Sequence, residues 1–140
     1  MSAADPAADL EAIRAVFARR LFAEGGATIH GDGRQTRDFV YVGDVVDAAL
    51  AAARSPAVGE LNVGTGVESE VREVFDRLAA TLAPGARASF APARPGDPRR
   101  SALSPGRAAA ALGWRARTDL AAGLSRTADW FRLDLQGSSR

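Results

Sequence analysis

A turn, an apolar run and a helix-forming run follow one another within residues 31–53, and this succession constrains the fold most. Asp32 and Gly33 predict the turn, because glycine adopts positive φ without strain and aspartate bonds to its own backbone. Residues 39–42 are apolar and predict a short buried strand. Asp44 is a suitable N-cap for the helix predicted after it. We therefore expect a strand between a polar turn and a helix.

Two arginines, Arg34 and Arg37, lie in or beside this turn. A guanidinium group can grip a phosphate or carboxylate with two parallel hydrogen bonds. We interpret the adjacent Asp38 as a buttress for Arg37 or a cap for a turn, and Tyr41 as a core residue. The stretch is therefore suited to binding an oxyanion.

The remaining elements follow from periodicity and from helix-stop signals. They are helices at 5–24, 69–82, 105–112 and from 119 onward, and strands at 27–30, 60–63 and 87–91. Strands that alternate with helices predict an α/β or α+β fold, of which we favour α/β.

Composition narrows the function. The chain has 140 residues, a net charge of +1 and scattered basic residues, which excludes an extended nucleic-acid surface. It has no cysteine and a single histidine, so we expect no disulfide and no multi-histidine metal site. No apolar run approaches the roughly 18 residues of a membrane span, and we expect a cytoplasmic protein. A small arginine-rich nucleic-acid binder is the least favoured alternative.

All 18 basic residues are arginine. A reaction that needs a lysine is therefore excluded for this polypeptide acting alone.

Residues 64–69 nearly match the dinucleotide fingerprint G-x-G-x-x-G/A between a predicted strand and a predicted helix. Ser69 replaces the third glycine, and no acidic residue follows about 20 positions later. We interpret the segment as a tight turn and expect no cofactor-binding residue in it.

Residues 31–47 contain the motif G-D-G-x-Q-T-R-D-F-V-Y-V-x-D-V-V. This motif resembles the C-terminal part of the extended short-chain dehydrogenase/reductases, the NAD-dependent epimerases and dehydratases of nucleotide sugars, and most closely the UDP-glucose 4-epimerase type. Further matching segments occur in the same order: Phe17–Leu21, Asn62–Gly66, Arg94–Asp97, Leu112–Trp114, and Gly123-Leu124 with Trp130.

The resemblance implies a substrate-binding role for six residues. Arg37 and Arg94 would grip the diphosphate, and Asp97 would accept a hydrogen bond from the ribose hydroxyls. Phe39 would pack near the base, and the backbone from Thr28 to His30 would meet the uracil edge. Two guanidinium groups neutralise a diphosphate, and a carboxylate suits a diol.

The resemblance also implies which parts are missing here. The family uses a Tyr-x-x-x-Lys pair and a glycine-rich NAD turn in an N-terminal Rossmann half; Val45 stands four residues after Tyr41, and no lysine is present. We therefore expect no catalytic residue in this chain, and NAD is implied by the family but not expected to bind this chain alone.

The expected organisation is a disordered start at 1–4, a nucleotide-sugar-binding portion at 5–133 and a flexible tail at 134–140. The favoured function is recognition of a UDP-glucose or UDP-galactose type nucleotide sugar within an NAD-dependent epimerase, an isomerase of carbohydrate metabolism. The chain would be a truncated product, a product with a misassigned start, or half of a split enzyme. The alternatives are a dehydratase or reductase fragment, or a non-catalytic binding or interaction module. Its partner would be the Rossmann half or a second copy.

Overall fold

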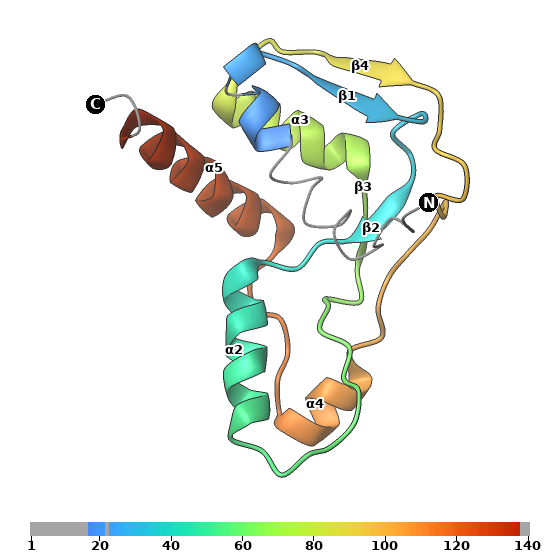
Figure 1. The fold of residues 1–140 in the computed structure, drawn as a ribbon, viewed down its shortest axis with the longest axis vertical. Coiled ribbons are helices and arrows are strands. Elements are labelled where there is room, and N and C mark those ends of the chain that lie inside the picture. The colour runs from blue at the N-terminus through green and yellow to red at the C-terminus, as the bar shows by residue number, and fades with distance from the viewer. Residues whose placement is uncertain (1–16, 22, 138–140) are drawn as a thin grey trace, which may run out of the picture.

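The computed structural model describes residues 17–21 and 23–137 and has an α/β architecture, which confirms the expected fold class (Figure 1). Residues 17–21 are helical. The elements that follow are β1 (Ala27–His30), β2 (Thr36–Asp38), α2 (Val42–Ala53), β3 (Glu68–Glu70), α3 (Val71–Leu82), β4 (Ala88–Ala91), α4 (Gly106–Leu112) and α5 (Leu120–Gly137). No helix in the described part of the chain is long and apolar enough to cross a membrane.

Two small sheets form the upper part of the molecule in Figure 1. β1 pairs in parallel with β4, with Ala27 opposite Ala88 and His30 opposite Ala91. β2 pairs antiparallel with β3. α3 lies beneath the β1–β4 sheet and packs against α5.

The main core lies between these elements. The apolar stripe of α3 supplies a large share of it, as the helical spacing of its valines, leucines and phenylalanine predicts. Phe17 meets Phe75 edge to face, with ring centroids 5.8 Å apart. The residues that are almost fully enclosed are Phe75, Leu21, Ile29, Leu78 and Val74.

A second, smaller core holds α2 and α4 together in the lower part of the molecule. Its buried members are Ala48, Ala108 and Trp114, and Leu61 and Val63 pack against them from the side. The Trp114 indole donates a buried hydrogen bond of 3.0 Å to the Asp44 carbonyl oxygen.

The strand predicted at 39–42 is wrong. The strand in this region is β2, which ends at Asp38, and α2 already begins at Val42. The N-cap is Tyr41, without a side-chain cap bond, so the assignment of Asp44 as N-cap is also wrong. The Asp44 carboxylate instead accepts hydrogen bonds from the backbone N–H groups of Arg117 and Thr118. The Asp44 carboxylate, which local sequence predicts to cap the helix, therefore binds the backbone of a distant loop instead.

Other boundaries differ in the same manner. Residues 60–63 form no strand, whereas Glu68–Glu70, whose polar sequence gives no strand signal, forms β3. Helix α5 continues to Gly137, into the segment expected as a tail. Tyr41 is half-buried under the Arg126 guanidinium, 5.3 Å from the ring centre, rather than in the core. The expectations for residues 1–4, and for the helix start at residue 5, lie outside the described residues.

We expect Phe75→Ala to lower the free energy of unfolding by about 3–5 kcal/mol, because it leaves a cavity in the main core. Urea unfolding followed by circular dichroism measures this loss. Val58→Ala is the matched control, since Val58 is 90% exposed and should change stability by less than about 0.5 kcal/mol. Equal effects of the two substitutions would contradict the assigned core.

Candidate functional site

Arg37 on β2 is the centre of the candidate site. Its side chain is almost fully buried, with 6% exposed. Nη1 donates to the carbonyl oxygens of Thr36, at 2.6 Å, and Pro98, at 2.8 Å, and Nη2 donates to the Asp97 carboxylate. These bonds use three of the five guanidinium N–H donors. Arg37 and Asp97, which are 60 positions apart in the sequence, are thus brought together.

Asp97 and Arg94 lie in the loop that follows β4. The Asp97 amide donates to the Arg94 carbonyl at 3.2 Å, and Gly96 between them has a φ of +82°, which favours glycine. The Asp97 side chain is 36% exposed, so its carboxylate is accessible although Oδ1 accepts from Arg37. The loop therefore carries both residues on one turn beside β2.

Two further ion pairs hold this loop farther along, at the adjacent residues Arg99 and Arg100. Arg99 bonds the Asp32 carboxylate with both terminal nitrogens, at 2.7 and 3.0 Å, and Arg100 bonds the Glu68 carboxylate. The Arg99 hydrogen bond, with the Arg34 amide, lowers the pKa of Asp32 to about 2, and the Arg100 hydrogen bond lowers the pKa of Glu68. The partners of Arg99 and Arg100 stand 67 and 32 positions away in the sequence, so no local pattern reveals either ion pair.

The free edge of β1 presents the backbone of Thr28 and His30. The Gly31 amide donates to Ala91 at 2.8 Å, and alternate residues of a parallel strand face its partner. The main-chain groups of Thr28 and His30 therefore point away from β4. No strand of the described structure pairs with this edge.

Gln35 is a site residue that the sequence did not single out. Its side chain is buried, and Nε2 donates to the His30 carbonyl oxygen at 2.6 Å. The main-chain carbonyl oxygen of Gln35 accepts a hydrogen bond from the Val71 amide at 3.0 Å. Gln35 thus ties the end of β1 to the start of α3 and fixes the orientation of the β1 edge.

Phe39 lies apart from the ion-paired loop. It is buried and lines a cavity of about 300 Å³ with Thr65, Val67, Ser69 and residues 116–120. This volume is at the lower end of the range for small-molecule sites. The structure brings Arg37, Arg94 and Asp97 together, and Phe39 faces a neighbouring cavity that these three residues do not line.

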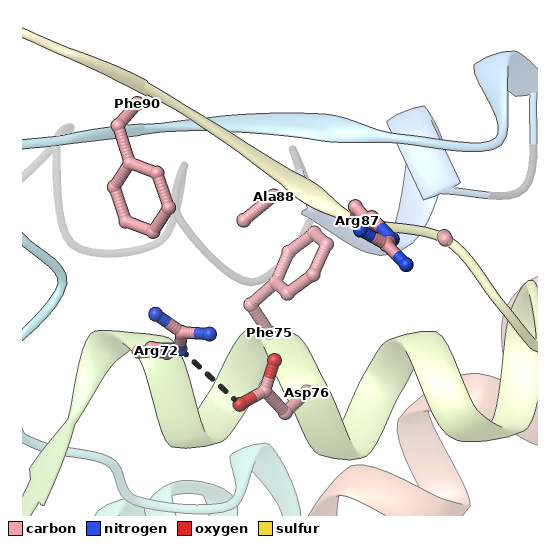
Figure 2. A pocket seen from close by; sticks show the side chains of 7 residues that line it. Arg72, Phe75, Asp76, Arg87, Ala88 and Phe90 are labelled. Carbon is pink, nitrogen blue, oxygen red and sulfur yellow. Dashed lines mark ion pairs between the residues drawn. The ribbon is translucent and has the colours of Figure 1, made fainter.

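A second cavity, of about 290 Å³, lies between α3 and β4 (Figure 2). Arg72 and Phe90 stand at one end of it, with the guanidinium carbon 5.6 Å from the ring centre, and Arg87 stands at the other end. Arg72 also pairs with Asp76 across 3.6 Å. None of the predicted substrate-binding residues lines this cavity.

The turn at residues 64–66 is closed to a phosphate. The amides of Thr65 and Gly66 donate to the Asp38 carboxylate at about 3 Å, so they are not available to an anion. A Cβ on Gly64 would lie 2.6 Å from an Asp38 oxygen. The turn is therefore a structural one capped by Asp38, and its donors do not fit the pyrophosphate of a dinucleotide.

Comparison with known proteins gives this geometry a context. The family model described as GDP-mannose 4,6 dehydratase matches residues 10–127. A UDP-glucose 4-epimerase of Mycolicibacterium smegmatis is 42% identical over 119 residues, which are 84% of this chain and 38% of that protein. A putative UDP-glucose 4-epimerase of Methanocaldococcus jannaschii is 36% identical over the same shares of both chains.

Solved structures agree with the sequence comparison. The UDP-glucose 4-epimerase of Thermotoga maritima with UDP-glucose superimposes with a TM-score of 0.82 at 35% identity, over 88% of this chain and 40% of that one. The Thermus thermophilus UDP-glucose 4-epimerase in complex with NAD gives 0.75 at 38% identity, over 86% and 40%. The chain thus spans about two fifths of the length of the relatives it matches.

We expect Arg99→Ala to raise the pKa of Asp32 from about 2 toward its ordinary value of 3.8. Because folding lowers this pKa, the ion pair stabilises the loop fully above pH 3.8 and loses its effect as the pH falls toward 2. Carboxyl-carbon NMR titration measures the shift, with Arg115→Ala as the control. An unchanged Asp32 titration in Arg99→Ala would contradict the pairing.

We expect Arg37→Met to lower the free energy of unfolding by about 3 kcal/mol, since it leaves the Asp97 carboxylate and two carbonyl oxygens without their donor. Arg100→Met removes an exposed partner and should cost at most about 1 kcal/mol. Urea unfolding compares the two variants. A similar small loss in both would show that Arg37 does not organise the loop.

Proposed function

We propose that this chain, which belongs to the family of the GDP-mannose 4,6 dehydratases, recognises the nucleotide portion of a nucleotide sugar. In the proposal it is the C-terminal part of an NAD-dependent sugar-nucleotide epimerase, with a ligand of the UDP-glucose or UDP-galactose type. The observation that carries the proposal is the contact of Arg37 with Asp97, which lies on one turn with Arg94 in the loop after β4.

Each predicted residue has a place in this proposal. Arg94 and the remaining donors of Arg37 would meet the diphosphate, and the exposed part of the Asp97 carboxylate would accept from the ribose hydroxyls. The main-chain groups of Thr28 and His30 would pair with the base edge, which carries donors and acceptors in fixed order. Phe39, which lines the neighbouring cavity, would pack near the base.

The reaction itself would depend on residues outside this chain. The 140 residues contain no lysine, and the glycine turn at 64–66 is filled by Asp38. When NAD is bound to a complete enzyme of this kind, it supplies hydride transfer. The residues of this chain would bind and orient the substrate, and residues 5–133 would form the nucleotide-sugar-binding portion.

The type of reaction is part of the proposal. The relatives include a dTDP-glucose 4,6-dehydratase of Actinoplanes, 33% identical, and a UDP-glucuronic acid decarboxylase of Arabidopsis thaliana, 32% identical. The epimerase of M. smegmatis is more similar, at 42%. This difference favours an epimerase over a dehydratase or decarboxylase.

We expect the purified chain to bind UDP in a calorimetric titration, and Arg94→Ala to weaken binding by about 10- to 100-fold. This range corresponds to the roughly 1.5–3 kcal/mol of a hydrogen bond to a charged group. Arg115→Ala removes an exposed arginine and should leave the dissociation constant within roughly twofold.

Binding by the wild-type chain that persists unchanged in Arg94→Ala would overturn the assigned diphosphate site. A folded wild-type chain that binds no UDP would show that this chain alone is no nucleotide-binding module. Circular dichroism of each variant separates a lost contact from a lost fold.

A further inference from the structure

The cavity between α3 and β4 has an arginine at each end and apolar side chains between them (Figure 2). Its volume of about 290 Å³ is close to the roughly 300 Å³ at which small-molecule sites begin. Phe75 and Ala88 line its middle, Arg72 stands with Phe90 at one end, and Arg87 stands at the other. A ligand that fits this lining has an apolar body and a negative charge.

The Arg72 end of the cavity is held in place from several sides. The guanidinium group pairs with Asp76 across 3.6 Å and lies over the Phe90 ring, 5.6 Å from its centre. The Arg72 amide donates to the Gly33 carbonyl oxygen at 3.0 Å. A Cβ on Gly33 would lie 2.9 Å from the Arg72 Cβ and 3.5 Å from the Phe90 ring, so this turn packs closely against both side chains. Phe90 is 48% exposed, and this end therefore offers a preformed aromatic surface.

Arg87 supplies the uncompensated charge of the cavity. Its side chain is exposed, and its guanidinium group makes no ion pair or hydrogen bond with any other residue that the structure describes. Because Asp76 offsets the charge of Arg72, the lining keeps one net positive charge. A carboxylate carries a single negative charge and meets a guanidinium group with two parallel hydrogen bonds, whereas a phosphate monoester carries about 1.5 to 2 negative charges. The charge of the lining therefore favours a carboxylate.

We propose that this cavity binds a small aromatic carboxylate, with the carboxylate on Arg87 and the ring over Ala88 and Phe75 toward Phe90. A ring is favoured over an aliphatic chain because two phenylalanine rings line the cavity, and aromatic pairs gain more than their buried area alone provides. The site is separate from the proposed nucleotide site, since none of the predicted substrate-binding residues lines it. It stands or falls independently of the proposed function.

The test is titration of the full chain, labelled with nitrogen-15, with benzoate at constant ionic strength, followed by amide NMR spectra. We expect the chemical shifts that change to gather at residues 72–76 and 86–90, which border the cavity. Acetate has the charge without the ring, and benzamide has the ring without the charge. Each should bind at least tenfold more weakly than benzoate, and phenyl phosphate should bind no more tightly than benzoate.

Three variants assign the contacts. Arg87→Ala removes the uncompensated cation and should weaken benzoate binding at least tenfold, as expected for a lost hydrogen bond to a charged group. Phe90→Ala removes an exposed ring and should weaken binding about 2- to 10-fold. Arg77→Ala is the matched control, because Arg77 is an arginine of α3 that pairs with Glu73 and does not line the cavity. It removes the same charge and should leave the dissociation constant within roughly twofold.

Several outcomes would overturn the proposal. Spectra that benzoate leaves unchanged, or shifts that gather at other residues, show that the cavity is not the site. Equal binding of acetate shows a general anion site, equal binding of benzamide shows a hollow that does not recognise charge, and tighter binding of phenyl phosphate shows a phosphate site. Full-strength binding by Arg87→Ala, in a variant whose spectrum is that of a folded chain, removes the assigned contact. UDP that displaces benzoate and shifts the same amides would refute the separation of the two sites.

Discussion

The buried guanidinium of Arg37 is the interaction on which the arrangement of the loops depends. It joins the Thr36 carbonyl of β2 to the Pro98 carbonyl and the Asp97 carboxylate of the loop after β4. The backbone of Thr36 adds hydrogen bonds to Arg99 and Ser101 in the same loop. A lysine could not replace this arginine. Its side chain ends in a single nitrogen, whereas the rigid planar guanidinium donates to three separate acceptors from two nitrogens. The two small sheets are therefore linked by a side chain and a loop.

This link explains how short strands can support a binding surface. β2 and β3 contain three residues each, which is too little for independent stability. They are held because α3 follows β3 directly and buries its stripe in the main core, and because the Arg72 and Val71 amides bond to the carbonyls of Gly33 and Gln35. The turn at Gly33 is tight enough that a Cβ there would lie 2.9 Å from the Arg72 Cβ. The rigidity of the candidate site thus derives from α3, which carries none of its predicted ligands.

Sequence patterns were sufficient for α3 and β1, which bury regular apolar positions. They also predicted β4, although β4 has no buried residue. The family resemblance singled out Arg37, Arg94 and Asp97. The contact between Arg37 and Asp97 needed the structure, because it joins positions 60 apart. Local rules failed at Asp44 and at residues 39–42. The Asp44 carboxylate accepts from the backbone of a distant loop and its carbonyl oxygen accepts from the Trp114 indole, so the side chain does not cap the helix. They also failed at 60–63, where the alternating pattern is present but its ladder partner is not among the described residues. In both cases a tertiary contact, made or missing, outweighed local propensity.

The unequal size of the two cores has a consequence for how the molecule opens. Regions with few buried contacts unfold locally at low free-energy cost, while well-packed regions open only with the whole domain. The α2–α4 part, built on Ala48, Ala108 and Trp114, is the low-cost unit, and the β1–β4 part with α3 and α5 is the high-cost unit. Amide exchange with solvent would accordingly be fast in α2 and slow in α3. The loop that bears Arg94 and Asp97 is bonded to the slowly opening unit, so its geometry can outlast transient melting of the rest of the chain.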